Sequence, residues 1–335
     1  MARAEGQYIR SAYFGGGTPS LLSAGNIGDL LSLIKRHFAL DKATEISIEA
    51  NPGTVDEAYL SAILKMGVNR LSLGVQSLND RELAMLGRIH TAAEAIDAVR
   101  FARNSGFDNL NLDFIYGLPG QTLADWKQTL LGAFTLQPEH LSLYALTLEE
   151  DTPLSKMIKE GSLPESNEDL SADQYELAED LLAVHGFSHY EISNWARPGR
   201  ECRHNLTYWQ NLPYIGVGAA AHSCLNGRRF ANSKNLDEYI AGYSQKQSVL
   251  LPEMNEEINP ELELAETAIL GLRLGEGINV DYLQNRFNVD VLAHYQRQVE
   301  EMAGAGLLER ADRNIRLTRR GRLLSNEVFW RFLPE

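Results

Sequence analysis

Short apolar runs alternate with longer amphipathic segments as far as about residue 195. The apolar runs are typical of buried strands, whereas the segments between them carry apolar residues at the spacing of a helix. The predicted strands span residues 9–14, 45–50, 70–75, 110–115, 140–146 and 189–193. The predicted helices span residues 25–38, 54–66, 80–86, 92–105, 122–136 and 171–185. This alternation predicts parallel strands joined by helical crossovers, and hence an α/β sheet or barrel.

From about Glu261 the pattern changes to successive helices followed by a short hairpin. The predicted helices span 262–273, 280–287 and 292–305, the hairpin spans 306–318, and a last helix ends near residue 332. This order is typical of a winged-helix-like α+β module. We therefore expect a barrel in residues 1–195, a barrel-closing extension that includes a linker near 247–260 in residues 196–260, and this module in residues 261–335.

Polar residues and glycines stand where several of the predicted strands end. Parallel sheets and barrels place their binding sites at the carboxyl ends of the strands. The positions are Gly16, Gly17 and Thr18 after the first strand, then Glu49, Gln76, Asp113 and Ala145. Because these positions occur in successive units, we expect them to converge on one mouth and to form a ligand site there.

The chemistry of these residues suits a nucleotide or an amino acid. Glycines let a ligand approach the main chain, and free N–H groups in such a loop bind a carboxylate or phosphate. Carboxylates such as Glu49 and Asp113 are costly to bury unless they are paired or bind a ligand, and carboxylates commonly hold ribose hydroxyls. Arg88 is suited to clamping a carboxylate with two hydrogen bonds. The alternatives for these residues are a tight turn, a helix cap and an ion pair.

Composition narrows the class of ligand. The chain has 31 basic and 45 acidic residues and a formal net charge of −14, which a phosphate backbone would repel, so we expect no nucleic-acid partner. A regulatory or scaffold role that uses the C-terminal module stays open, because six arginines lie there. They are Arg310, Arg313, Arg316, Arg319, Arg320 and Arg322.

No apolar run is long enough for a membrane span, the first residues are too polar for a signal peptide, and two cysteines form no disulfide framework. We therefore expect a soluble, cytoplasmic protein.

Five motifs occur in the order found in a known family. They are YFGGGTPSLL at 13–22, EANPG at 49–53, LSLGVQS at 71–77, GRIH at 87–90 and DFIYGLPGQT at 113–122. In these motifs the chain resembles the oxygen-independent coproporphyrinogen III oxidases and the related HemW-type haem chaperones of the radical SAM superfamily. The resemblance covers essentially the whole chain. It implies an incomplete (β/α)6 barrel of the radical SAM type, followed by a small winged-helix-like α+β domain.

The resemblance also implies that S-adenosylmethionine (SAM) binds at the mouth. Its methionyl group would lie on Gly16, Gly17 and Thr18, its carboxylate and ribose would contact Glu49, Gln76, Arg88 and Asp113, and its adenine would lie by Ala145. No catalytic residue follows from the resemblance alone.

The stretch HNLTYW at 204–209 resembles the HNxxYW signature of the chaperones. It favours a haem chaperone over a coproporphyrinogen oxidase, which would decarboxylate two propionates and stays as the alternative. His204 is the candidate haem contact, and Tyr208 and Trp209 would pack on a porphyrin face. The partners implied are haem or a porphyrin and a haem-recipient protein. The other interpretation is a cluster that supports the fold.

The cysteines do not match the family's CxxxCxxC segment, which precedes the glycine loop and binds a [4Fe–4S] cluster. Only 14 residues precede Gly15, and the two cysteines are Cys202 and Cys224. We therefore expect that the cluster ligands are absent from this chain, that the chain as written forms no 5′-deoxyadenosyl radical, and that the missing first unit exposes a barrel edge. A zinc site from Cys202, His204, His222 and Cys224 is a weaker alternative, because its one-residue gaps are tighter than usual.

Overall fold

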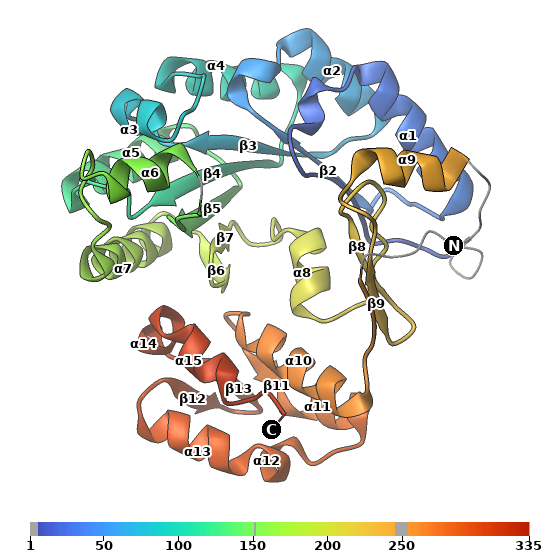
Figure 1. Ribbon diagram of the computed structural model, residues 1–335, viewed down its shortest axis with the longest axis vertical. Coiled ribbons are helices and arrows are strands. Elements are labelled where there is room, and N and C mark those ends of the chain that lie inside the picture. Colours follow the sequence, from blue (N-terminus) through green and yellow to red (C-terminus); the bar gives the residue numbers. More distant parts are fainter. Residues whose placement is uncertain (1–5, 151, 245–253, 335) are drawn as a thin grey trace. The chain divides into compact units, whose positions relative to one another are not determined.

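The computed structural model describes residues 6–150, 152–244 and 254–334. The chain forms two compact units, Met1–His204 and Asn205–Glu335, and Figure 1 shows the course of the chain through both. The boundary falls between His204 and Asn205, inside helix α8 (Arg203–Trp209). The division into three parts, with boundaries at 195 and 260, stays a prediction beside these two units.

The first unit is built on a seven-stranded sheet in the order β1-β2-β3-β4-β5-β7-β6. The strands are β1 (Ser11–Phe14), β2 (Glu45–Ala50), β3 (Arg70–Gln76), β4 (Leu110–Tyr116), β5 (His140–Ala145), β6 (Ser188–Glu191) and β7 (Asn194–Ala196). Strands β1 to β5 are parallel, and they form the partial barrel of the predicted α/β fold class, which is confirmed.

Helices connect these strands and lie outside the curved sheet, as Figure 1 shows for α1, α2 and α4. They are α1 (Ala24–His37), α2 (Glu57–Met66), α3 (Asp80–Met85), α4 (Ala92–Ser105), α5 (Leu123–Thr135), α6 (Pro153–Lys159) and α7 (Glu168–Val184), with single turns η1 (Pro19–Leu21) and η2 (Pro52–Thr54). Local sequence sets their ends. Thr91 and Thr122 each begin a helix with a capping box, and Gly106 ends α4 at a φ of 102°.

The two faces of the sheet differ sharply in polarity, because successive strand residues point to opposite sides. The outer face is apolar and buried, and includes Ile46, Ile48, Leu71, Leu73, Leu110, Leu112, Phe114, Leu141 and Leu143. The inner face carries Ser11, Tyr13, Glu45, Ser47, Glu49, Arg70, Ser72, Asn111, Asp113, His140 and Ser142, which the register places in adjacent rows. Burying the outer face under helices drives the fold, and it leaves the polar chemistry to the inner face.

The sixth strand differs from the prediction of another parallel strand at 189–193. Strands β6 and β7 form a hairpin, and β7 pairs antiparallel with β5, so that His140 lies opposite Ala196. Only Ile192 and Ser193 separate the two strands, which is far too few residues for a helical crossover. The parallel part of the barrel therefore ends at β5.

The second unit begins with a small sheet that the sequence analysis did not predict. Strands β8 (His222–Leu225), β9 (Arg228–Ala231) and β10 (Met254–Glu257) pair in the order β10-β9-β8, and α9 (Leu236–Ser244) follows β9. Asn226 and Gly227 join β8 to β9 with φ values of 55° and 71°, as a tight hairpin turn requires. Of the predicted linker at 247–260, residues 247–253 lie outside the described residues, and 254–257 form β10.

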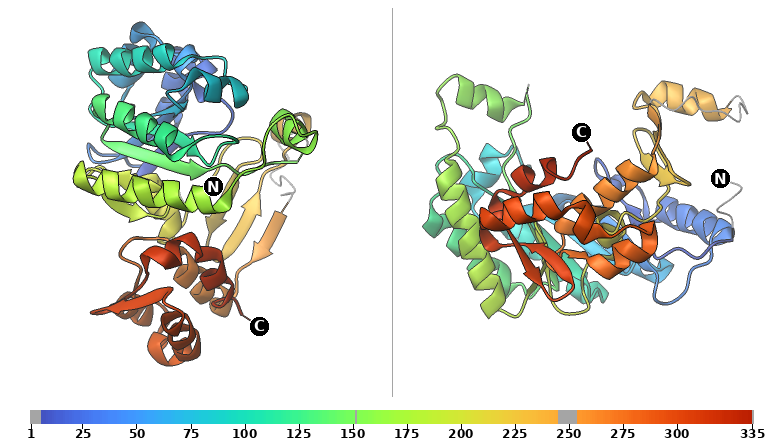
Figure 2. Two further views of the ribbon diagram at one scale, coloured as in Figure 1. Left: turned by 90° about the vertical axis from the view of Figure 1, so that its left-hand side faces the viewer. Right: turned by 90° about the horizontal axis from the view of Figure 1, so that it is seen from below.

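The rest of this unit is the expected α+β module, and Figure 2 shows its short strands among its helices in red and orange. Its elements are α10 (Pro260–Leu272), β11 (Ile278–Asn279), α11 (Val280–Phe287), α12 (Val291–His294), α13 (Gln296–Gly304), β12 (Leu308–Ala311), β13 (Asn314–Leu317), α14 (Arg319–Leu323) and α15 (Ser325–Trp330). The strands pair in the order β11-β13-β12. The helix predicted at 292–305 is interrupted at Tyr295. Within the described ranges, no helix is both long and apolar enough to cross a membrane.

Candidate functional site

The predicted site residues lie around one end of the half-barrel, which we call the mouth. Gly16 and Gly17 follow β1, Glu49 lies near the end of β2, and Asp113 lies in β4. Gln76 ends β3 and Ala145 ends β5, while Arg88 lies in the loop between α3 and α4. The carboxyl ends of parallel strands share one edge of a sheet, so the structure brings these segments together.

The glycine loop is fastened to β2 by the carboxylate of Glu49. The N–H of Gly16 donates to Glu49 Oε2 over 3.2 Å, and the hydroxyl of Tyr13 donates to Glu49 Oε1 over 2.6 Å. Gly16 and Gly17 have φ values of 82° and 59°, and a Cβ on either would meet no atom within 4 Å. The loop therefore combines a backbone conformation that favours glycine with open space beside its main chain.

Tyr13 was not singled out by sequence reasoning, although it stands beside the glycines. Its ring lies so close to Gly15 that a Cβ there would be 2.5 Å from Tyr13 Cε1. Burial and the neighbouring Glu49 carboxylate raise the pKa of Tyr13, so its phenol stays protonated and acts as a donor. Gly15 is therefore required for packing, and Tyr13 positions Glu49.

Asp113 lies deeper on the inner face and is held by hydrogen bonds. Its Oδ2 accepts from Ser72 Oγ over 3.1 Å, and its Oδ1 accepts from Asn111 Nδ2 over 2.7 Å. Burial raises the pKa of Asp113, while hydrogen bonds from Ser142, Asn111 and Ser72 oppose that rise. Burial also lowers the pKa of Arg88, and the negative charge of Asp113 opposes that change. Asp113 and Arg88 therefore interact electrostatically across the mouth.

Gln76 and Ala145 complete the set at the ends of β3 and β5. Gln76 is buried and has a φ of 67°, an uncommon conformation for a residue other than glycine. The register between β3 and β4 shifts between Leu73 and Gln76, and such an irregularity re-aims a side chain at the end of a strand. Ala145 is exposed. The preceding Tyr144 is 43% exposed, yet desolvation of its hydroxyl and the nearby charge of Asp113 raise its pKa.

His204 lies at the start of α8, against the amino-terminal ends of β1 and β2. Its ring stacks on Tyr13, with centroids 4.5 Å apart and planes 8° from parallel. Its Nδ1 is 3.2 Å from Ser11 Oγ. The carboxylate of Glu45 accepts from the backbone N–H groups of Arg203, over 3.0 Å, and of His204, over 3.1 Å. The first turn of α8 is therefore attached to the inner face of the first unit.

The environment of His204 keeps its imidazole neutral. Burial and the charge of Arg70 lower the pKa of His204 to about 4, although Glu45 opposes the change. The imidazole ring is therefore uncharged at neutral pH. The stacking on Tyr13 and the pairing of Nδ1 with the hydroxyl of Ser11 are also compatible with the alternative interpretation of a cluster that supports the fold.

The other half of HNLTYW packs within the second unit. The guanidinium carbon of Arg273 lies 4.3 Å from the ring centroid of Trp209. The rings of Tyr208 and Tyr214 pack edge to face, with their centroids 4.7 Å apart. Both contacts are typical cation–π and aromatic packing. One short helix therefore supplies anchoring side chains to each unit.

A buried polar cluster fills the inner face below the mouth, and sequence reasoning did not identify it. Arg70 is 2% exposed and Glu45 is 6% exposed. Burial alone would lower the pKa of Arg70, but the nearby Cys202 and Glu45 raise it above its ordinary value. The signal was the period of two in Glu45-Ile46-Ser47-Ile48-Glu49, which marks one polar and one apolar face.

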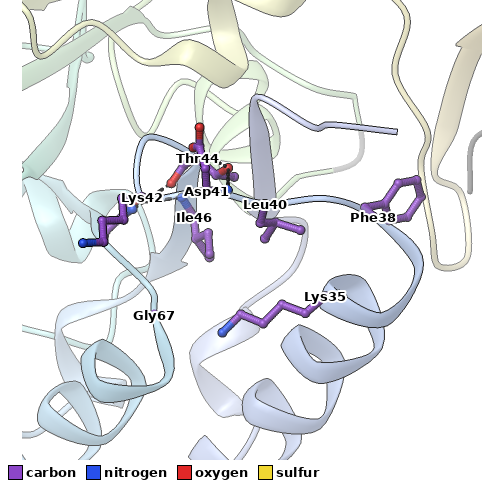
Figure 3. Close-up of a pocket in the computed structure, with 9 residues that line it drawn as sticks. Lys35, Phe38, Leu40, Asp41, Lys42, Thr44, Ile46 and Gly67 are labelled. Carbon is purple, nitrogen blue, oxygen red and sulfur yellow. Dashed lines mark hydrogen bonds between the residues drawn. The ribbon is translucent and has the colours of Figure 1, made fainter. Parts of the chain in front are cut away.

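Figure 3 shows a pocket of about 410 Å³ elsewhere in the first unit. Its lining residues are Lys35, Phe38, Leu40, Asp41, Lys42, Thr44, Ile46, Gly67 and Asn69. They lie at the amino-terminal ends of β2 and β3, opposite the mouth, and Lys35 Nζ donates to the carbonyl of Met66 over 3.1 Å. None of the predicted site residues lines this pocket.

The cysteines do not fit an iron–sulfur cluster. Cys202 is buried beside Glu45, with its Sγ 3.5 Å from Glu45 Oε1, and Cys224 lies in β8 of the second unit. Among the residues that the structure describes, no three His, Cys, Asp or Glu side chains form a group that could hold a metal ion. The described residues therefore include no set of three cysteines that could hold a [4Fe–4S] cluster.

The arginines of the C-terminal module are in part paired with acidic residues. Arg313 makes two hydrogen bonds to Asp281, and Arg316 Nε is 2.7 Å from Glu309 Oε1. These pairs reduce the positive charge that the hairpin offers to a phosphate backbone.

Two family models match the chain. The model of the radical SAM superfamily matches residues 1–131, and that of the HemN C-terminal domain matches residues 258–324. Among solved structures, coproporphyrinogen III oxidase (HemN) from Escherichia coli, described as a radical SAM enzyme, aligns with a TM-score of 0.83 over 97% of this chain and 78% of that chain. At 23% identity, this likeness shows a shared fold.

Curated relatives are closer in sequence. The heme chaperone HemW of Lactococcus lactis is 36% identical over 97% of this chain and 85% of its own length. The proteins of the same name from Bacillus subtilis and Mycobacterium tuberculosis H37Rv are 34% and 35% identical, over 98% of this chain and 86% and 81% of their own lengths. The resemblance inferred from the five motifs and HNLTYW is thereby confirmed. This chain belongs to the family of HemW-type heme chaperones within the radical SAM superfamily.

Proposed function

We propose that this protein binds haem as a cargo and delivers it to a recipient protein, and that SAM binds at the mouth of its half-barrel. One residue carries the proposal. Tyr13 donates to Glu49 beside the glycine loop, and its ring stacks on His204 of the HNxxYW motif. The glycine-loop motif and the first residue of HNxxYW therefore meet within one compact unit.

The residues of the mouth have the chemistry that SAM requires. The N–H groups of the loop and Arg88 suit its carboxylate, and Glu49 suits its ammonium group. Asp113 suits the ribose hydroxyls. In the proposed site, Gly16, Gly17 and Thr18 lie along the methionyl group, Gln76 adds a polar contact, and Ala145 borders the adenine. When bound, SAM supplies an electrophilic sulfonium centre.

His204 is the proposed contact to the haem iron. A neutral imidazole is a common axial ligand of haem, and the lowered pKa of His204 keeps its ring neutral at physiological pH. Tyr208 and Trp209 are proposed to contact the porphyrin. The coproporphyrinogen oxidase alternative has only the shared fold of HemN behind it, whereas the curated relatives support the chaperone.

A haem titration followed at the Soret band tests the cargo proposal. We expect saturable one-to-one binding by the wild-type chain, at least tenfold weaker binding by His204→Ala, and unchanged binding by the control His37→Ala. The control removes an exposed histidine of the same unit. Wild-type binding that never saturates would contradict the proposal, and equal affinity for His204→Ala would remove His204 as the ligand.

Equilibrium dialysis with radiolabelled SAM tests the mouth. Asp113→Asn keeps the size of the side chain and removes its charge, so we expect the dissociation constant to rise about tenfold or more. Asp56→Asn, which changes the exposed cap of α2, is the control. SAM affinity that is equal in all three proteins would place the ligand elsewhere.

A further inference from the structure

We propose that Asn111 and His140 are positioning residues, which hold the carboxylate of Asp113 for the ribose hydroxyls of its ligand through a chain of hydrogen bonds that begins at Tyr190. The proposal rests on the SAM site proposed above. It assigns a purpose to polar side chains that are buried in the half-barrel and have no place in the predicted set of contacts.

The four side chains are linked by short hydrogen bonds across three strands. The hydroxyl of Tyr190 in β6 is 2.8 Å from His140 Nε2. His140 Nδ1 is 2.6 Å from Asn111 Oδ1, and Asn111 Nδ2 is 2.7 Å from Asp113 Oδ1. His140 is fully buried and Asn111 is 2% exposed, so water contributes little to this chain of contacts.

The direction of each hydrogen bond follows from the carboxylate at the end of the chain. An ionised Asp113 can only accept, so the amide nitrogen of Asn111 must face it. The amide oxygen of Asn111 then faces His140, and it also accepts from Ser142 Oγ over 3.1 Å. His140 must therefore carry its proton on Nδ1 and donate it to Asn111.

The other ring nitrogen of His140, Nε2, must then accept a hydrogen bond, and the hydroxyl of Tyr190 donates it. Burial and the charge of Arg70 lower the pKa of His140 well below its ordinary value, so the ring stays neutral and keeps one tautomer. Burial raises the pKa of Tyr190, which keeps its hydroxyl protonated. Each hydrogen bond therefore donates toward Asp113, and bonds arranged in this way strengthen one another.

The result is a carboxylate that is held on both oxygens from within the sheet. Asn111 donates to Oδ1, and Ser72, which itself accepts from Asn111 over 2.7 Å, donates to Oδ2 over 3.1 Å. Together with Ser142, these donors lower the pKa of Asp113 and so favour its ionised form against burial and against the like charge of Glu49. An oriented, ionised carboxylate is the form that accepts hydrogen bonds from two ribose hydroxyls.

Other titratable groups also face Asp113, and they set the background for any pH dependence. They are Glu49 on β2, Tyr13 on β1, Arg88 before α4 and Tyr144 on β5. None of them touches Asn111 or His140 in the contacts above. A change at Asn111 therefore reports on Asp113 through the hydrogen bond that is lost.

The test is the pH dependence of SAM binding by the full chain, measured by equilibrium dialysis between pH 5 and pH 9. Removing the donor at Asn111 raises the pKa of Asp113, so binding should be lost at a higher pH as the solution is acidified. For Asn111→Leu we expect the midpoint of this loss to move up by about one pH unit or more. The control Asn104→Leu changes an exposed asparagine of α4 and should leave the midpoint unchanged.

His140 provides the second arm, which does not depend on Asn111→Leu folding. His140→Asn keeps a donor close to the position of Nδ1 and should retain the wild-type midpoint, whereas His140→Leu should shift it upward. Nitrogen NMR of the wild-type chain should show the tautomer of His140 that is protonated on Nδ1, and circular dichroism checks that each variant is folded.

The outcomes separate the two proposals. If the wild-type chain binds SAM, and folded Asn111→Leu and His140→Leu have the same pH midpoint as the wild type, the positioning role alone is overturned. The Nε2-protonated tautomer of His140 would overturn the proposed donor and acceptor roles in this series of hydrogen bonds. Absence of SAM binding by the wild-type chain would overturn the SAM site, and the ribose role of Asp113 with it.

Discussion

Glu45 and Glu49 lie four residues apart on the same face of β2, yet their surroundings differ and suit them to different roles. Glu45 is 6% exposed, lies near Arg70, and accepts from the first N–H groups of α8. Glu49 is partly exposed and is held by Tyr13 and the glycine loop. Position along the strand therefore distinguishes a carboxylate that stabilises the fold from one that we propose to contact a ligand.

The largest expected effect comes from Glu45→Ala. The change removes the negative charge of Glu45 near the buried Arg70 and leaves two N–H groups of α8 without their acceptor, so we expect stability to fall by about 3–5 kcal/mol. Urea unfolding followed by circular dichroism measures this loss. A wild-type midpoint for Glu45→Ala would show that the two ends of β2 do not differ as described.

Glu49→Gln is the matching change at the mouth. We expect its stability to change by about 1 kcal/mol or less, because the amide keeps a hydrogen bond with Tyr13. SAM should bind about tenfold more weakly, because a neutral amide attracts an ammonium group less than a carboxylate does. Dialysis and urea unfolding of the same sample sharpen the contrast, and a large loss of stability with normal SAM affinity would reverse it.

Tyr13→Phe separates the two contacts of Tyr13, which are its hydrogen bond to Glu49 and its stacking on His204. The variant loses the hydrogen bond to Glu49 and keeps the ring that stacks on His204. We expect SAM affinity to fall a few-fold, by roughly 0.5–1.5 kcal/mol, while haem affinity stays at the wild-type value. Tyr13→Leu also removes the ring, so it should weaken haem binding as well. Equal haem affinities for the two variants would show that the stacking has no influence on His204.

The smallest effect expected is a pH dependence of stability. The pKa of His204 is lowered from about 6.5 to about 4 in the folded chain, so the unfolded chain binds more protons between these values. The stability that neutral His204 contributes is complete above pH 6.5 and is lost as the pH falls toward 4. His140 changes stability in the same direction. Urea midpoints between pH 7 and pH 4.5 should therefore fall less steeply for His204→Phe than for the wild type.

Much of the first unit could be predicted because its signals are local. Apolar runs and helical spacing located β1 to β5 and α1, α2, α4 and α5 to within a few residues. The capping boxes at Thr91 and Thr122 mark two of those helices in the sequence itself. The rule that sites lie at the carboxyl ends of parallel strands placed Glu49 near the end of β2, whereas Asp113 lies in the middle of β4 because that strand continues to Tyr116.

The parts that were missed depend on contacts between distant residues. The alternation in β2 shows that Glu45 and Glu49 share a face, but it does not show that α8 covers one of them. The link between His140 and Tyr190 is equally invisible, because it required the antiparallel hairpin of β6 and β7. The sequence at 189–193 predicted a strand without giving its direction.

The attachment of His204 also has a consequence for the order in which the chain folds. Its ring contacts Ser11, which is 193 residues away, and its N–H reaches Glu45, which is 159 residues away. Such contacts close late, whereas neighbouring βα units form over short loops. We expect pulse-labelled hydrogen exchange to protect the amides of β2 to β4 before those of Arg203 and His204, and simultaneous protection would refute this order. During synthesis, strands β2 to β4 would then assemble first, and His204, the proposed haem ligand, would make its contacts only after residue 204 has left the ribosome.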